Sequence, residues 1–131
     1  MFFYHVNAIV LTIIVFICHI IPGKDIDIFG WDLLLSIDKI FHFFVFGILS
    51  ISYLLSFRSF FKNHKNISNN RYIFFVLFII IIYGFLLELI QGLFVVDRIF
   101  EFADLLSDLL GAVFFMFCFI KLNLNKYFNL D

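Results

Sequence analysis

The 131-residue chain is 64% hydrophobic and only 15% charged, and its mean hydropathy is +1.11. Soluble domains contain about half apolar residues, so this composition excludes a water-soluble globular domain. A net charge of −1 also argues against nucleic acid as a partner, because phosphate binding requires a basic surface. A chain of this length forms one domain, which we expect to cover residues 1–131.

Four apolar segments follow one another, at residues of about 2–21, 40–57, 72–91 and 105–122. Each has 18 to 20 residues, close to the roughly 20 that a helix needs to cross a hydrocarbon core about 30 Å thick. None alternates apolar and polar residues as a half-buried strand does, and four strands cannot close a barrel in lipid. The sequence therefore predicts an all-α integral membrane protein, a bundle of about four transmembrane helices.

The first apolar segment differs from a secretory signal peptide. Residues 1–4 carry no basic side chain, and Pro22, Gly23, Lys24 and Asp25 stand where a cleavage site would have small residues. We therefore expect a first span that is retained.

Basic residues are distributed unequally between the two predicted sides of the membrane. With helices of alternating direction, the side of both termini holds Arg58, Lys62, Lys65, Arg71, Lys121 and Lys126. The opposite side holds Lys24, Lys39 and Arg98. Because cytoplasmic segments carry an excess of Lys and Arg, we predict that both termini are cytoplasmic.

The two connectors on the predicted outer side contain apolar residues as well as charges. The segment 22–39 includes Trp31, and we expect it to lie in the membrane interface with this side chain as an aromatic anchor. The segment 92–103 is short and half apolar, and we expect it to fold back toward the membrane.

Charged residues in or beside the apolar segments are the candidates for function. An ionisable residue at a helix centre costs roughly 2.5–3.5 kcal/mol on insertion scales, so such residues usually face a protein interior. Residues four or seven apart share one face of a helix. Three faces follow this spacing: Asp38 and His42; Gly84, Glu88 and Gln91; and Asp104, Asp108 and Gly111.

The predicted topology brings these three faces to one depth, near the outer ends of their helices. Arg98 directly precedes the last of them. At a rise of 1.5 Å per residue, all the polar residues lie within ~10 Å of the same membrane surface. We therefore predict a polar site at the outer face, formed by Asp38, His42, Glu88, Gln91, Arg98, Asp104 and Asp108.

Other residues have simpler interpretations. We expect Lys39, Asp97 and Glu101 to be solvated residues at helix ends. His19, at the end of the first span, could join this site, but an interface residue is the interpretation that we prefer. Close helix packing is the role expected of three glycines, Gly47, Gly84 and Gly111.

Three spaced patterns run through this part of the chain: Asp38-Lys39-x-x-His42, Tyr83-Gly84-x-x-x-Glu88-x-x-Gln91 and Arg98-x5-Asp104-x3-Asp108-x2-Gly111. Together, in this order, they resemble the VanZ-like family, small four-helix membrane proteins named for one linked to teicoplanin resistance. The resemblance covers about residues 20 to 115. Two positions depart from the family pattern: Asp108 stands where Asn is usual, and Phe115 where a small residue is frequent.

The resemblance implies a multi-pass protein of the bacterial cell membrane, with its site facing the outside. It further implies action on or near lipid-linked sugars of the cell envelope, or on lipoglycopeptide antibiotics. Carboxylates accept hydroxyl protons, and Arg98 would bind phosphate as a fork. The expected partners are therefore the lipid bilayer and a lipid-linked sugar or glycopeptide headgroup.

Two other functions remain open. His42 with Glu88, Asp104 and Asp108 could hold a divalent metal, or act as general acid and base on a lipid headgroup. Alternatively, the polar residues could only fix the helix assembly of a scaffold or accessory protein. No HExxH motif, nucleophile elbow or Cys/His ligand spacing is present, so we predict no cofactor. Whether a reaction is catalysed is left open.

Overall fold

The computed structural model describes residues 2–20, 31–61, 69–96 and 98–122. These contain four helices, α1 (Phe2–Ile20), α2 (Trp31–Phe61), α3 (Asn69–Phe94) and α4 (Phe102–Lys121), and the described ranges contain no strand. Each helix includes a stretch long and apolar enough to cross a membrane. The predicted all-α bundle of four membrane-spanning helices is confirmed.

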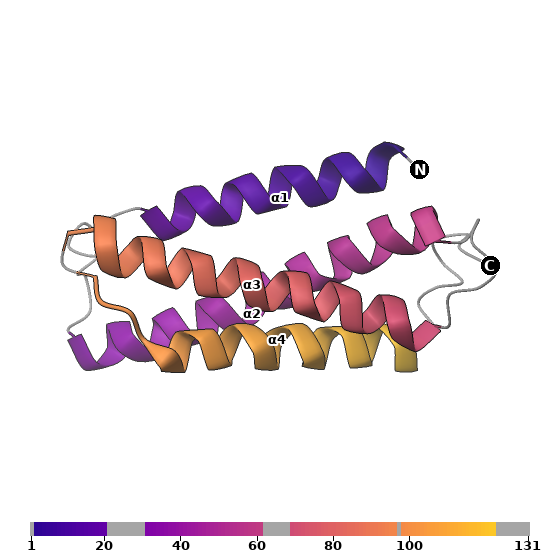
Figure 1. Ribbon diagram of the computed structural model, residues 1–131. Coiled ribbons are helices and arrows are strands. Elements are labelled where there is room, and N and C mark those ends of the chain that lie inside the picture. Colours follow the sequence, from indigo (N-terminus) through magenta and orange to yellow (C-terminus); the bar gives the residue numbers. More distant parts are fainter. Residues whose placement is uncertain (1, 21–30, 62–68, 97, 123–131) are drawn as a thin grey trace.

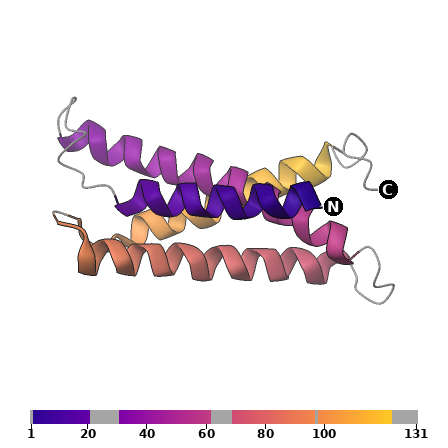
Figure 2. The same cartoon turned by 90° about the horizontal axis from the view of Figure 1, so that it is seen from above.

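The four helices run alternately in opposite directions (Figure 1). The most extensive interface joins α2 and α4, whereas α1 packs against α2 and α3 on the opposite side of the bundle (Figures 1 and 2). One end of the bundle therefore holds the last turn of α1 at Ile20, the first turns of α2, the end of α3 at Phe94 and the start of α4 at Phe102. We call this end the polar end.

Helix α2 is longer than the span predicted at 40–57. It begins at Trp31, so residues 31–39 are the first turns of a helix that continues into the apolar stretch Ile37–Phe57. The place of residues 31–39 in the membrane interface stays a prediction. The predicted role of the Trp31 side chain lies outside the described residues, as do residues 22–30. The same holds for most of the 58–71 connector, for Asp97 and for Lys126.

The connector between α3 and α4 folds back onto the last turn of α3. A Cβ atom built on Gly92 would lie 3.0 Å from the backbone nitrogen of Phe100, which shows how closely the two backbones approach. Val96 and Ile99 remain 71% and 72% exposed, an arrangement suited to contact with lipid. The depth of this connector in a membrane stays a prediction.

Apolar side chains occupy both the interior and the exterior of the bundle. The interior is formed by residues of all four helices, among them Val15, Phe46, Leu49, Val76, Ile80, Leu87 and Ala112. The exterior carries Phe74, Phe78 and Phe117, which are 72%, 61% and 60% exposed. A helix that is apolar all round matches a lipid environment.

Two glycines bring α2 and α4 close together. A Cβ atom on Gly111 would overlap the carbonyl oxygen of Phe43 on α2. One on Gly47 would lie 2.5 Å from the ring of Phe115 on α4. Small residues at such contacts let helix backbones approach in lipid, and here Gly47 provides the space that the large Phe115 requires.

Candidate functional site

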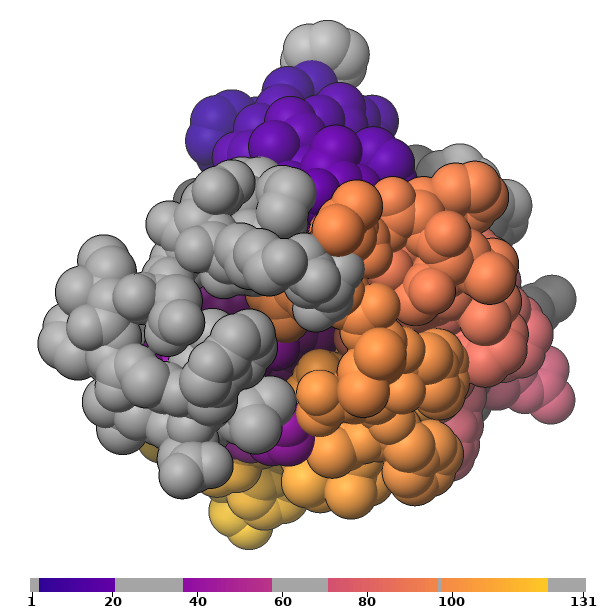
Figure 3. Space-filling view, turned by 90° about the vertical axis from the view of Figure 1, so that its left-hand side faces the viewer, coloured from indigo at the N-terminus to yellow at the C-terminus, as the bar shows by residue number. Residues whose placement is uncertain are grey.

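Ten polar side chains meet at the polar end of the bundle. They come from all four helices and from the α3–α4 connector. Figure 3 shows this end of the bundle, where residues of α3, the connector and α4 lie beside the last turns of α1. We call them the polar cluster: His19, Asp38, Lys39, His42, Glu88, Gln91, Arg98, Glu101, Asp104 and Asp108. All seven predicted site residues belong to it, and hydrogen bonds, ion pairs or ring contacts link every member to another.

The centre of the polar cluster is a pair of buried side chains. His42 on α2 and Asp108 on α4 are each 2% exposed, and the His42 Nδ1 lies 2.9 Å from the Asp108 Oδ1. An ionised carboxylate only accepts hydrogen bonds, so Nδ1 carries the proton, and in the neutral imidazole Nε2 then presents a lone pair. That Nε2 lies 4.0 Å from the Asp38 Oδ1, on the preceding turn of α2.

Ion pairs connect the start of α2 to the connector and to α4. The guanidinium of Arg98 donates from Nη1 to Asp38 Oδ2 at 2.7 Å. The ammonium of Lys39 donates to Glu101 Oε2 at 3.0 Å and lies 3.4 Å from Asp104 Oδ1. The side chains of Lys39 and Glu101 are about one third exposed, which places this pair at the rim of the cluster.

Two polar side chains of α3 form hydrogen bonds to two different neighbouring segments, the connector and α1. Glu88 is 1% exposed, and its Oε2 accepts a hydrogen bond from the backbone N–H of Glu101 at 3.1 Å. One turn later, Gln91 donates from Nε2 to the backbone carbonyl of His19 at 3.0 Å. The carboxylate of Glu88 therefore holds the connector, while the amide of Gln91 holds α1.

Three expectations from the sequence are wrong. His19 is not an interface residue, because its side chain is only 2% exposed: Nδ1 donates to the Val15 carbonyl at 2.7 Å, and the ring centre lies 4.7 Å from that of His42. Lys39 and Glu101 are not simply solvated, because they pair with each other. The sequence could have predicted this ion pair, because Lys39 and Glu101 carry opposite charges and lie at the same predicted depth.

Three buried carboxylate oxygens accept no hydrogen bond within the described part of the chain: Glu88 Oε1, Asp104 Oδ1 and Asp108 Oδ2. Lys39 reaches an ion-pair distance from Asp104 Oδ1 but not a hydrogen-bond geometry. Buried polar atoms nearly always have a partner, so these oxygens are available to a ligand that brings donors or positive charge.

The polar cluster is acidic as a whole. Its five carboxylates, Asp38, Glu88, Glu101, Asp104 and Asp108, face two permanent cations, Lys39 and Arg98. Hydroxyl groups, amines and metal ions therefore suit it better than an anion does. Among the described residues, Asp38, His42 and Asp104 are close enough to share one metal ion.

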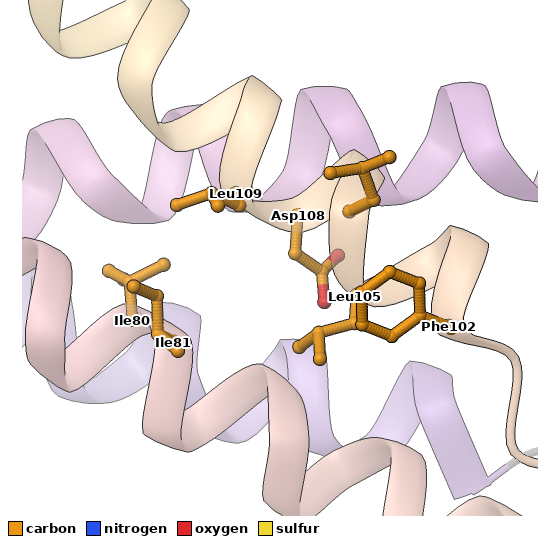
Figure 4. A pocket seen from close by; sticks show the side chains of 7 residues that line it. Ile80, Ile81, Phe102, Leu105, Asp108 and Leu109 are labelled. Atoms are coloured by element: carbon orange, nitrogen blue, oxygen red, sulfur yellow. The ribbon is translucent and has the colours of Figure 1, made fainter.

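An apolar pocket of about 160 Å³ adjoins the cluster between α3 and α4 (Figure 4). Its apolar lining consists of Ile80, Ile81, Phe102, Leu105, Leu106 and Leu109. The one polar residue of its lining is Asp108, whose carboxylate also faces Gly84, where a Cβ atom would lie 2.7 Å from Oδ2. Gly84 thus leaves the room that this carboxylate occupies.

Comparison with known protein families identifies a match. The family model described as VanZ/LLP1 matches residues 2–124, nearly the whole chain. None of the curated proteins and none of the solved structures matches it. The four membrane-spanning helices agree with the four-helix architecture that the resemblance implied, and the chain belongs to the VanZ/LLP1 family.

Proposed function

We propose that the protein binds a sugar-bearing headgroup attached to a hydrocarbon chain, at the polar end of the bundle. Lipid-linked sugars and lipoglycopeptide antibiotics share this chemistry. The observation that supports the proposal best is the position of Asp108, which belongs both to the polar cluster and to the lining of the apolar pocket. The headgroup and the chain of one ligand would therefore meet adjoining surfaces of matching polarity.

The polar cluster suits sugar hydroxyls better than phosphate. Hydroxyl groups donate to carboxylate oxygens, and Glu88 Oε1 and Asp104 Oδ1 are acceptors without a hydrogen-bond donor. The Nη1 of Arg98 is already engaged by Asp38. Its Nε is a buried donor without a partner in the described residues, but the excess of carboxylates would repel an anion. The sugar, and not a phosphate held by Arg98, is therefore the part of the headgroup that we expect to be recognised.

The proposal places the polar end at the outer face of a bacterial cell membrane. Its support is the distribution of basic residues: six of the nine, including Arg71 and Lys121, belong to the opposite end of the bundle or to segments attached to it. Such an excess is typical of the cytoplasmic side. The exposed apolar side chains of Val96 and Ile99 also favour a connector that rests in the interface.

Binding to protein in lipid nanodiscs tests the proposal. The probes are a polyprenyl-linked sugar, polyprenyl phosphate without the sugar, and a lipoglycopeptide. We expect the sugar-bearing probes to bind at least about tenfold more tightly than the sugar-free lipid, the value of one hydrogen bond to a charged acceptor. Glu88→Gln and Asp104→Asn keep side-chain shape and should each remove most of that difference.

Ser107→Ala is the matched control, because Ser107 lies on α4 beside Asp108 but is bonded to its own helix at the Ala103 carbonyl, 2.9 Å away. It should bind all probes like the original protein. Equal affinity for the sugar-free lipid, or full binding by folded Glu88→Gln and Asp104→Asn, would contradict the proposal. The polar cluster would then have only a structural role, in the assembly of the helices.

The His42–Asp108 pair supports a second candidate, acid–base catalysis on the same headgroup. A histidine oriented by a buried carboxylate is the arrangement of many general bases, and the free Nε2 would take the proton. Mass spectrometry of the lipid-linked sugar after incubation with the protein tests this. Product formation that His42→Gln abolishes while binding persists would establish catalysis, and unchanged substrate would leave binding as the function.

A further inference from the structure

We propose that Asp38, His42 and Asp104 form a binding site for one divalent transition-metal ion. One ligand atom from each residue can be chosen so that all three lie within 4.8 Å of one another. A donor set of one imidazole nitrogen and two carboxylate oxygens suits Zn²⁺, Fe²⁺ or Mn²⁺. This inference does not rest on the sugar headgroup, since the metal alone tests it.

The orientation of His42 is the main argument. Histidines that bind metals usually donate their other ring N–H to a carboxylate, which fixes the tautomer and the ring. His42 does this through Nδ1 and Asp108 Oδ1, at 2.9 Å and almost entirely buried. The lone pair of Nε2 is then directed to the side of Asp38 Oδ1, 4.0 Å away, which is too far for a hydrogen bond.

Asp104 supplies an independent observation. Its side chain is 5% exposed, and its Oδ1 has no hydrogen-bond partner in the described residues. The ammonium of Lys39 lies 3.4 Å from this oxygen, but a buried carboxylate oxygen without a hydrogen bond is only partly satisfied by a lysine whose side chain is 33% exposed. A metal ion between Asp104, Asp38 and His42 would satisfy it.

The two neighbouring cations leave room for a metal ion. Arg98 binds Asp38 through Oδ2, so Oδ1 stays available on the side of His42. Lys39 lies 3.4 Å from Asp104 but has a shorter contact of 3.0 Å with Glu101, and its side chain is 33% exposed. It can therefore withdraw from Asp104 without losing its partner.

Metal titration of the purified full chain in detergent tests the site. Zn²⁺ is measured by competition with a chromophoric chelator and Mn²⁺ by electron paramagnetic resonance. We expect one equivalent to bind. Asp38→Asn and Asp104→Asn should weaken binding at least tenfold, and Asp108→Asn, which alters only the group that orients His42, by about 10–100-fold.

The control is His5→Gln. His5 lies near the start of α1, at the opposite end of the bundle, and its ring forms a hydrogen bond with the Ser56 hydroxyl. This variant should bind like the original chain. Binding that survives in folded Asp38→Asn and Asp104→Asn, or a folded original protein that binds neither ion, would overturn the site.

Discussion

The ring of His42 donates a hydrogen bond to the carboxylate of Asp108, 66 positions later in the chain, over 2.9 Å. The pair joins α2 to α4, the two helices with the most extensive interface. At membrane depth a lone imidazole or carboxylate is costly, and each residue satisfies the other. This single contact therefore contributes to helix assembly and also presents His42 Nε2 to a ligand.

Substitutions at Asp108 should separate shape from charge. Asp108→Asn keeps an oxygen that accepts from His42 Nδ1 and removes a buried carboxylate, so we expect the melting temperature in detergent to stay the same or rise. Asp108→Leu leaves the buried N–H of His42 unsatisfied and should cost about 1–3 kcal/mol. Equal melting temperatures for the Asp108→Asn and Asp108→Leu variants would show that the hydrogen bond between His42 and residue 108 adds nothing to stability.

Alanine substitutions at the two glycines between α2 and α4 should both lower stability, but only one of these losses should depend on the side chain of the contacting residue. Gly47→Ala places a methyl group against the ring of Phe115 and should destabilise the fold by about 1–3 kcal/mol. In a Phe115→Ala background the clash is absent, so the same Gly47→Ala substitution should cost much less than it does in the original chain. Gly111→Ala meets the backbone of Phe43, which cannot be truncated, so no side-chain substitution should rescue it.

Thermal unfolding of these single and double variants measures the difference. A Gly47→Ala variant as stable as the original chain would contradict the packing seen at this contact.

The Lys39–Glu101 ion pair should contribute little to stability. Its side chains are 33% and 28% exposed, and pairs of this kind contribute about 0.2–1 kcal/mol. In a double-mutant cycle with Lys39→Met and Glu101→Gln, we expect a coupling energy within that range that falls as salt is added. A coupling above about 2 kcal/mol would mean that the connector depends on this pair for its position.

Membrane orientation can be tested with single cysteines in a background of Cys18→Ser and Cys118→Ser. Val96→Cys lies in the exposed connector at the polar end, and Arg71→Cys is exposed near the start of α3, at the other end. A membrane-impermeant thiol reagent added to intact cells should label Val96→Cys and leave Arg71→Cys unlabelled until the cells are opened. The reverse pattern would invert the predicted topology.

Much of the architecture followed from the sequence, because in lipid every backbone polar group must be satisfied within its own segment. Four apolar stretches of about 20 residues therefore had to be helices, and the structure has them. The spacing of Asp38 and His42, or of Glu88 and Gln91, placed each set on one helical face. Alternating helix direction then brought these faces to the same end, where their side chains are buried or half-buried.

The tertiary structure alone decided which residues touch. The pairing of His42 with Asp108 depends on how α2 and α4 are rotated about their axes, and the close contacts at Gly47 and Gly111 are compatible with that rotation. Helix periodicity fixes a face but not its partner. For the same reason His19 seemed peripheral in the sequence: the packing of α1 against α2 and α3 is what buries its ring beside His42.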